Sequence, residues 1–326
     1  MIGKDELKTL YDNELKDKLS GLEGIRKTIK RGQVFGILLL VLPFLLIIPV
    51  SIALEGSNSE ALPFLILIPF AIFGIVLLVR THNKKKIYRD QYKNEVVRGI
   101  VNAIDPSWEY DPNQCINTFE YAASDLFRQS VDRYSGDDLI SGKIDKTDFR
   151  TSELHTEYKT VTYTKNGGRQ ETWHTIFRGL FFTADFNKEI IGRTYIEPDT
   201  AERLFGKLGQ KLQISSKGKL VKLENPEFEK IYAVYATDQT EARYILTPTI
   251  MEALVQIYRK YNRNLHLSFI GSRVYVAMSF NQNLFEPKVF SSGAKFEDVE
   301  FMFNLFMFNQ AIIHELNLNT RIWTKD

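Results

Sequence analysis

Two long apolar runs dominate the hydrophobic pattern of this chain. Residues 34–54 and residues 61–79 contain no charged side chain. A helix needs about 20 apolar residues to cross the hydrocarbon core of a bilayer, so each run predicts a transmembrane helix. The first run begins too late and is too long for a cleaved signal peptide, and the second run follows it at once. We therefore expect a two-helix membrane hairpin over residues 34–79.

Basic side chains flank the predicted hairpin on both outer sides, whereas its connecting residues 55–60 carry two acids and no Lys or Arg. The flanking residues are Arg26, Lys27, Lys30 and Arg31 before the first span and Arg80, Lys84, Lys85, Lys86 and Arg89 after the second. Because Lys and Arg collect on the cytoplasmic side, both termini are expected in the cytoplasm, as in a multi-pass inner-membrane protein. Anionic lipid attracts such charges, so Lys84, Lys85 and Lys86 form a candidate lipid-facing cluster.

Four prolines interrupt the predicted spans, namely Pro43, Pro49, Pro63 and Pro69. Membrane helices tolerate proline, which removes a backbone donor and bends the helix. A transport element would need ionisable groups within its spans, and these spans contain none. We therefore favour two kinked anchor helices, with an accessory subunit of a membrane transport complex as the alternative.

The first 33 residues predict an amphipathic helix. Leu15, Leu22 and Ile29 recur every seven residues, with Leu19 and Ile25 between them and charged residues at most other positions. This narrow apolar stripe favours packing on the cytoplasmic domain or on the helical segment 84–104 that follows the spans. Self-association as a short coiled coil is the alternative.

Strand patterns prevail after residue 134. Residues 138–149, 152–164 and 171–186 are rich in β-branched and aromatic side chains, and Asn166-Gly167 predicts a hairpin turn. We also expect strands at 242–246 and a second hairpin at 265–280 around Gly271. Helices are expected at 117–128, from Thr247-Pro248 onward, and at 296–316. We interpret the last as a core helix, with docking on the membrane surface or on a partner subunit as the alternative.

The overall prediction is an α+β fold with mainly antiparallel sheet and packed helices. We divide the chain into an amphipathic helix at 1–33, a membrane hairpin at 34–79, a juxtamembrane helical linker at 80–134 and a cytoplasmic α+β domain at 135–326. This last domain has a possible division into halves near residues 211–222, where a Gly- and Lys-rich turn interrupts the pattern.

Composition removes several classes of function. The net charge is +2, so no basic excess indicates nucleic acid, and the lone Cys115 excludes a disulfide framework. If Asn166-Gly167 forms a two-residue turn, His155 and His174 share one sheet face about 13 Å apart, too far for one metal ion. The other histidines are His82, His266 and His314. We therefore expect no metal, no cofactor and no catalytic residue of a recognisable motif.

One polar cluster is a candidate site. Asp238, Gln239, Glu241 and Arg243 lie on or beside a predicted turn between two apolar strands. Loops at the ends of sheets often hold binding residues. A solvated turn with an internal ion pair is the alternative interpretation.

Five stretches carry a resemblance to a known family: 135–140 (SGDDLI), 177–188 (FRGLFFTADFNK), 224–230 (ENPEFEK), 239–248 (QTEARYILTP) and 318–325 (LNTRIWTK). They resemble a family of bacterial two-pass inner-membrane proteins described as a domain of unknown function. The resemblance runs from Lys84 to the C-terminus, and the two-span layout is similar. It implies a bacterial source and a membrane location, and it implies no activity, cofactor or catalytic residue.

These observations together favour a membrane-anchored cytoplasmic binding or scaffolding module. Its expected partners are the lipid bilayer and either another membrane protein or a second copy of itself. An enzyme without a recognisable motif, with its site near the turn from Asp238 to Arg243, is the main alternative.

Overall fold

The computed structural model describes residues 3–53, 62–163, 168–199, 217–291 and 295–316. The chain divides into two compact units. The helical unit consists of residues 1–104 and 285–301, and the sheet unit consists of residues 105–284 and 302–326.

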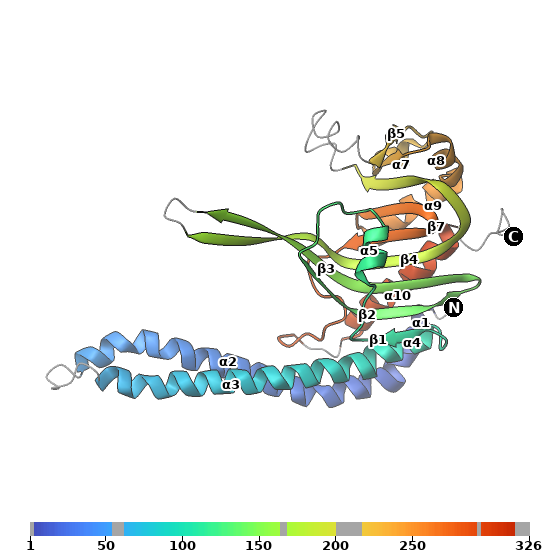
Figure 1. Cartoon of the computed structure of the whole chain (residues 1–326). Coiled ribbons are helices and arrows are strands. Elements are labelled where there is room, and N and C mark those ends of the chain that lie inside the picture. The colour runs from blue at the N-terminus through green and yellow to red at the C-terminus, as the bar shows by residue number, and fades with distance from the viewer. Residues whose placement is uncertain (1–2, 54–61, 164–167, 200–216, 292–294, 317–326) are drawn as a thin grey trace. The chain divides into compact units, whose positions relative to one another are not determined.

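Two long helices form most of the helical unit (Figure 1). The chain begins with α1 (Lys4–Leu10), the π-helical turn η1 (Tyr11–Leu15) and α2 (Lys16–Ala53). It returns through α3 (Leu62–Tyr92), the π-helical turn η2 (Lys93–Val97) and α4 (Arg98–Ile104). Both of these continuous helical stretches are long and apolar enough to cross a membrane.

Apolar side chains on α2 and α3 point outward over the predicted spans. Phe44 is 79% exposed and Phe73 is 60% exposed. The two helices approach each other closely, because a Cβ atom added to Gly74 would lie only 3.0 Å from the carbonyl oxygen of Gly36. Small residues at the crossing permit this backbone contact, which is common between membrane helices.

The N-terminal apolar stripe is buried within the helical unit. Leu15, Leu19, Leu22 and Ile29 are each at most 5% exposed. A Cβ atom added to Gly99 of α4 would lie 3.2 Å from Leu15, so the stripe packs beside the helices that follow the spans.

Residues 285–301 bind to this helical pair although they are distant in sequence. Arg26 donates a hydrogen bond of 2.7 Å to the carbonyl oxygen of Val289. The buried Lys93 forms an ion pair of 3.3 Å with Glu286. The rings of Tyr11 and Phe296 meet edge to face at 5.3 Å. These three contacts join the segment to the helices outside the apolar spans.

The sheet unit is built on seven antiparallel strands in the described part of the chain. The strands are β1 (Glu109–Asp111), β2 (Arg133–Ile144), β3 (Thr147–Tyr163), β4 (Arg169–Pro198), β5 (Lys219–Val221), β6 (Tyr232–Ala236) and β7 (Leu265–Ser279). Their order is β1-β2-β3-β4-β6-β5, and β7 also pairs with the long β4. Beyond the other strands, β3 and β4 continue as a two-stranded arm (Figure 1).

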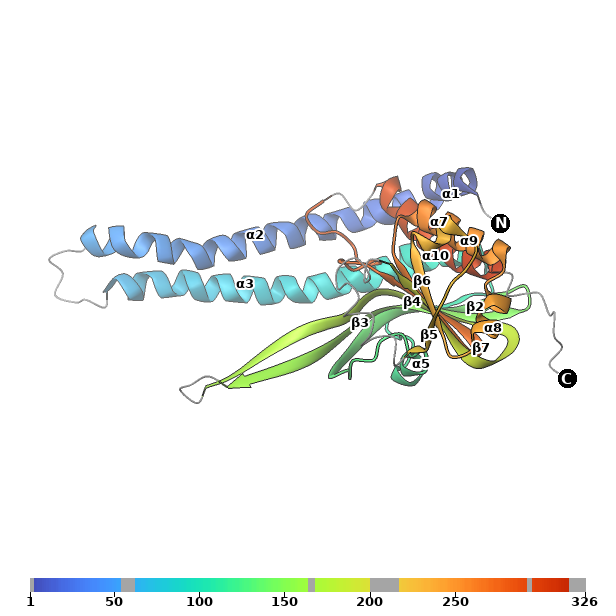
Figure 2. The same ribbon diagram turned by 90° about the horizontal axis from the view of Figure 1, so that it is seen from above.

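The helices of the sheet unit are α5 (Thr118–Ala123), α7 (Pro226–Glu229), α8 (Gln239–Ile245), α9 (Pro248–Tyr261) and α10 (Phe296–Glu315), whose residues from Met302 onward belong to this unit. Figure 2 shows α9 and α10 on one face of the sheet and α5 on the opposite face. We call the latter the α5 face. Its apolar core joins Tyr121 and Leu126 to Leu154, Phe177 and Phe181 of the strands.

The α+β prediction and several elements are confirmed. Tyr163 pairs with Arg169, so β3 and β4 form the predicted hairpin, although its turn lies outside the described residues. The side-chain oxygen of Thr247 accepts from the N–H of Ile250 and caps α9 as expected. The final helix is α10, in which Phe306 is 1% exposed.

Three local predictions are wrong. Residues 242–246 belong to the helix α8 and its C-cap, because Asp238 caps a helix instead of ending a turn. Instead of a hairpin at 265–280, residues 265–279 form the single strand β7, in which Gly271 (φ +59°) produces a bend. In the β3–β4 hairpin the register shifts between Thr156 and Glu157, so His174 pairs with Tyr158, three positions from His155. The two histidines therefore lie on opposite faces of the sheet and not on one face.

Candidate functional site

The polar cluster predicted from sequence has mainly structural contacts. The Asp238 carboxylate accepts from the N–H groups of Thr240 at 2.8 Å and Glu241 at 3.0 Å, which caps α8. The Glu241 carboxylate accepts from the N–H groups of Ile191 at 2.9 Å and Gly192 at 2.7 Å. Both acids therefore satisfy backbone donors that would otherwise lack a partner.

The other two members of this cluster point to different neighbours. The Gln239 side chain donates to the carbonyl oxygen of Leu220 at 3.4 Å, and the Arg243 guanidinium donates to the carbonyl oxygen of Gln239 at 3.4 Å. The structure thus places the four residues on one short helix without bringing their polar atoms to one point.

The lysine cluster is exposed on α3. In the described part of the chain, none of Lys84, Lys85 and Lys86 forms an ion pair. Three adjacent positive charges are therefore available to a negatively charged surface.

The two strand histidines have separate local partners. The Nε2 atom of His155 lies 3.4 Å from the hydroxyl of Thr175. His174 stacks on Tyr158 at 4.8 Å, and its Nε2 atom lies 2.9 Å from the hydroxyl of Thr160. These contacts explain both residues as members of the arm.

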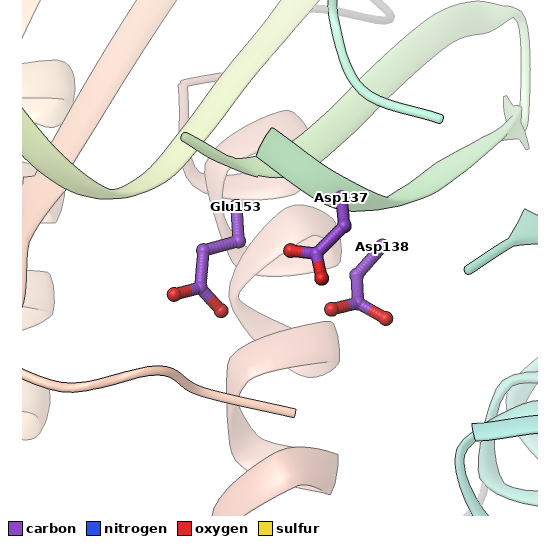
Figure 3. Close-up of side chains that lie close together, drawn as sticks. All are labelled: Asp137, Asp138 and Glu153. Atoms are coloured by element: carbon purple, nitrogen blue, oxygen red, sulfur yellow. The ribbon is translucent and has the colours of Figure 1, made fainter. Parts of the chain in front are cut away.

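Sequence reasoning missed a cluster of three carboxylates on β2 and β3, whose side chains lie close together (Figure 3). Ligand oxygens of Asp137, Asp138 and Glu153 lie within 4.8 Å of one another. Asp138 has a left-handed backbone (φ +59°) at a β-bulge, which turns its side chain toward its neighbours. Asp137 and Glu153 are cross-strand partners.

Buried carboxylates require hydrogen bonds or cations. The hydroxyl of Tyr110 donates to Asp138 at 2.5 Å, and the N–H of Leu284 donates to Glu153 at 2.8 Å. Carboxylate oxygens suit Mg²⁺ or Ca²⁺, which take six or more oxygen ligands. Three carboxylates alone do not complete such a set, so this cluster by itself does not define a metal centre.

A second network lies on the α5 face. Glu197 of β4 accepts hydrogen bonds from Lys217 and from His266 of β7, both at 2.5 Å. Burial alone would raise the pKa of Glu197, but the hydrogen bonds and charges of His266 and Lys217 outweigh it and lower this pKa below its ordinary value. The carboxylate is therefore ionised at neutral pH.

The same network fixes the segment that follows α5. Lys217 also donates to the carbonyl oxygen of Leu126 at 3.0 Å. Asp125 accepts from the hydroxyl of Tyr195 at 2.5 Å and from Arg193 at 3.2 Å. Burial raises the pKa of Tyr195 to about 12, so its hydroxyl remains a donor at neutral pH. These bonds join residues 125–126 to β4, and they account for the charges without a catalytic role.

A polar depression of about 590 Å³ lies at another end of the α5 face. Strands β1, β2, β3 and β7 and the helix α5 all contribute to its lining. The charged side chains that line it are Glu109, Glu120, Lys143, Asp148, Arg150 and Arg273. Sequence reasoning missed this site because its residues come from separate strands and meet only through the register of the sheet.

The described fold is that of an α+β protein with two apolar helices that could cross a membrane. Residues 175–318 match the family described as "Protein of unknown function (DUF3137)". This match supports the expected domain of unknown function, and it covers neither apolar helix. No curated protein and no solved structure matches the chain.

Proposed function

We propose that this protein is a membrane-anchored binding module of a bacterial inner membrane, with both termini and the sheet unit in the cytoplasm. The observation that carries the proposal is the apolar surface of α2 and α3. Side chains such as Phe44 and Phe73 are mostly exposed there. Soluble monomers rarely expose so continuous an apolar surface, and lipid would cover it.

The distribution of charge supports the proposed orientation. Seven basic residues border the apolar stretches without an ion pair among the described residues: Lys27, Lys30, Arg31, Arg80, Lys84, Lys85 and Lys86. Each Lys or Arg near an anionic leaflet contributes about 1 kcal/mol of attraction. Anionic lipid in the cytoplasmic leaflet therefore favours an orientation in which these basic residues face the cytoplasm.

A binding role accords better with the sheet unit than the enzyme alternative does. The two acids of the alternative enzyme site near Arg243 already have structural partners. Asp238 caps α8, and Glu241 accepts hydrogen bonds from the backbone of β4. The polar depression offers charged groups from several strands to a ligand. Recruitment of a membrane-protein partner or of a second copy would suit a tethered module of this kind.

Reporter fusions test the anchoring and the orientation. A reporter that is active only outside the cytoplasm should work when inserted between Gly56 and Ser59, and it should be inactive after Asp326. A cytoplasm-specific reporter at the same two positions is the control, with the reverse pattern expected. Activity of the external reporter after Asp326 would overturn the proposal, as would release of the full chain from membranes by alkaline carbonate.

A further inference from the structure

We infer that the polar depression on the α5 face is a binding site for the carboxylate or phosphate group of a small ligand, and that Arg273 is its main contact. This inference deepens the binding function proposed above by naming a ligand class. It rests on the register of the sheet, on the hydrogen bond that orients Arg273 and on the pairing of the surrounding charges.

The sheet register brings the polar residues together in two neighbouring rows. In the first row Ser141 pairs with Arg150, and Arg150 pairs with Thr183. In the second row Lys143 pairs with Asp148, and Asp185 pairs with Arg273. Cross-strand partners point to the same face, so these side chains gather on one side of the sheet.

Arg273 is the cation in this depression whose guanidinium is held in place and is free to bind. It is half-buried, and its Nε atom donates to the hydroxyl of the buried Thr183 at 3.0 Å. No carboxylate among the described residues forms an ion pair with Arg273. Its cross-strand neighbour Asp185 has an interaction of its own. Both terminal nitrogens therefore remain available.

The other charges of the depression are largely neutralised. Arg150 is paired with Glu120 at 2.8 Å, and Lys143 is paired with Asp148 at 3.7 Å. Glu109 is the remaining acid of the lining, and it lies on β1, four strands from β7. Four strand spacings amount to about 19 Å, where solvent and salt screen most of its repulsion.

This arrangement selects a planar or tetrahedral oxyanion. A guanidinium presents parallel N–H groups that match two oxygens of a carboxylate or phosphate. Arg150 lies two strands from β7 and its charge is paired with Glu120, so Arg273 supplies the positive charge that a bound group would meet.

Calorimetric titration of the full chain tests the site. The protein is placed in nanodiscs of zwitterionic lipid, and inorganic phosphate and succinate are titrated separately at constant ionic strength. Saturable binding of at least one of them is expected. Arg273→Gln should weaken it at least tenfold, because it removes both the charge and the paired donors. Arg273→Lys retains the charge without the paired donors and should weaken it about fivefold.

The matched control is Arg169→Gln, which also removes one arginine charge. Arg169 lies at the start of β4, outside the depression, and is paired with Glu171. This variant should leave the affinity within twofold of the wild type. Binding of phosphate alone would identify a phosphoryl ligand, and binding of succinate alone a carboxylate ligand.

Three results would overturn the inference: no saturation by either anion, equal affinity in the wild type and Arg273→Gln, or equal affinity in Arg273→Lys if Arg273→Gln does not fold. None of them would alter the reporter pattern that tests membrane anchoring. The two proposals can therefore fail independently.

Discussion

Truncation of Phe181 probes the apolar core beneath α5. Phe181 is completely buried in β4, and its ring centroid lies 5.4 Å from that of Tyr121 and 6.4 Å from that of Tyr275. Phe181→Ala removes a ring that α5 and β7 both contact, and such cavities cost about 3–5 kcal/mol. In a unit of this size each kcal/mol lowers the unfolding midpoint by about 2–4 °C, so we expect a decrease of about 6–20 °C.

Phe119 provides a matched control on the same helix as Tyr121. It is 81% exposed, so Phe119→Ala should change stability by no more than about 0.5 kcal/mol. Thermal unfolding of the detergent-solubilised full chain, followed by near-ultraviolet circular dichroism, measures both variants. Equal shifts for the two phenylalanines, or a shift below about 2 °C for Phe181→Ala, would refute the assignment of this core.

Two further predictions concern buried polar groups. Because the pKa of Glu197 is below its ordinary value of about 4.3, its ionised form should stabilise the fold above that pH, and this contribution should disappear as the pH falls further. Glu197→Gln should accordingly lower the unfolding midpoint at pH 7, and the difference from the wild type should shrink as the pH falls below that ordinary pKa value. A pH-independent difference would contradict the network. Asn309 is completely buried, and within the described part of the chain neither polar atom of its amide has a hydrogen-bond partner, which costs about 1–3 kcal/mol. Asn309→Leu should therefore raise the midpoint in the same assay, and a lower midpoint would show that the amide is bonded.

Elements with strong local signals could be predicted from the sequence. The long uncharged runs correspond to the apolar parts of α2 and α3, because a helix of that length needs no tertiary information to be recognised. Thr247-Pro248 begins α9, since the hydroxyl caps the helix and proline suits its first position. The hairpin between β3 and β4 follows from its Asn-Gly turn signal.

The wrong predictions arose where one residue has two plausible local roles. Asp238 was interpreted as a turn residue, but the spacing from Asp238 to Glu241 is also typical of a helix start, and that signal could have identified α8. Gly271 was interpreted as a hairpin turn, yet a glycine with positive φ also permits a bend within one strand. A single bulge after Thr156 shifts the cross-strand pairing of His174 by one residue. The hydrophobic pattern of the sequence does not reveal such a bulge.

The candidate sites depend on contacts that no local pattern encodes. Glu197 meets His266 and Lys217 only because β4 and β7 pair and residue 217 returns beside them. Asp137 and Glu153 likewise meet across two strands. The association of residues 285–301 with α2 and η2 is even harder to predict from the sequence, because the contact between Arg26 and Val289 joins residues 263 positions apart.

The length of α5 explains why a ligand site can exist on this face of the sheet. α5 contains six residues and is thus about 9 Å long, whereas the strands from β1 to β7 span about 19 Å. Its aromatic residue Tyr121 covers the apolar centre around Phe181, and the sheet continues beyond it. Because an unpaired charge is costly under an apolar cover, Arg273 is tolerated only beyond that cover, in the depression. The short helix therefore stabilises the centre of the face and leaves its charged end accessible to a ligand.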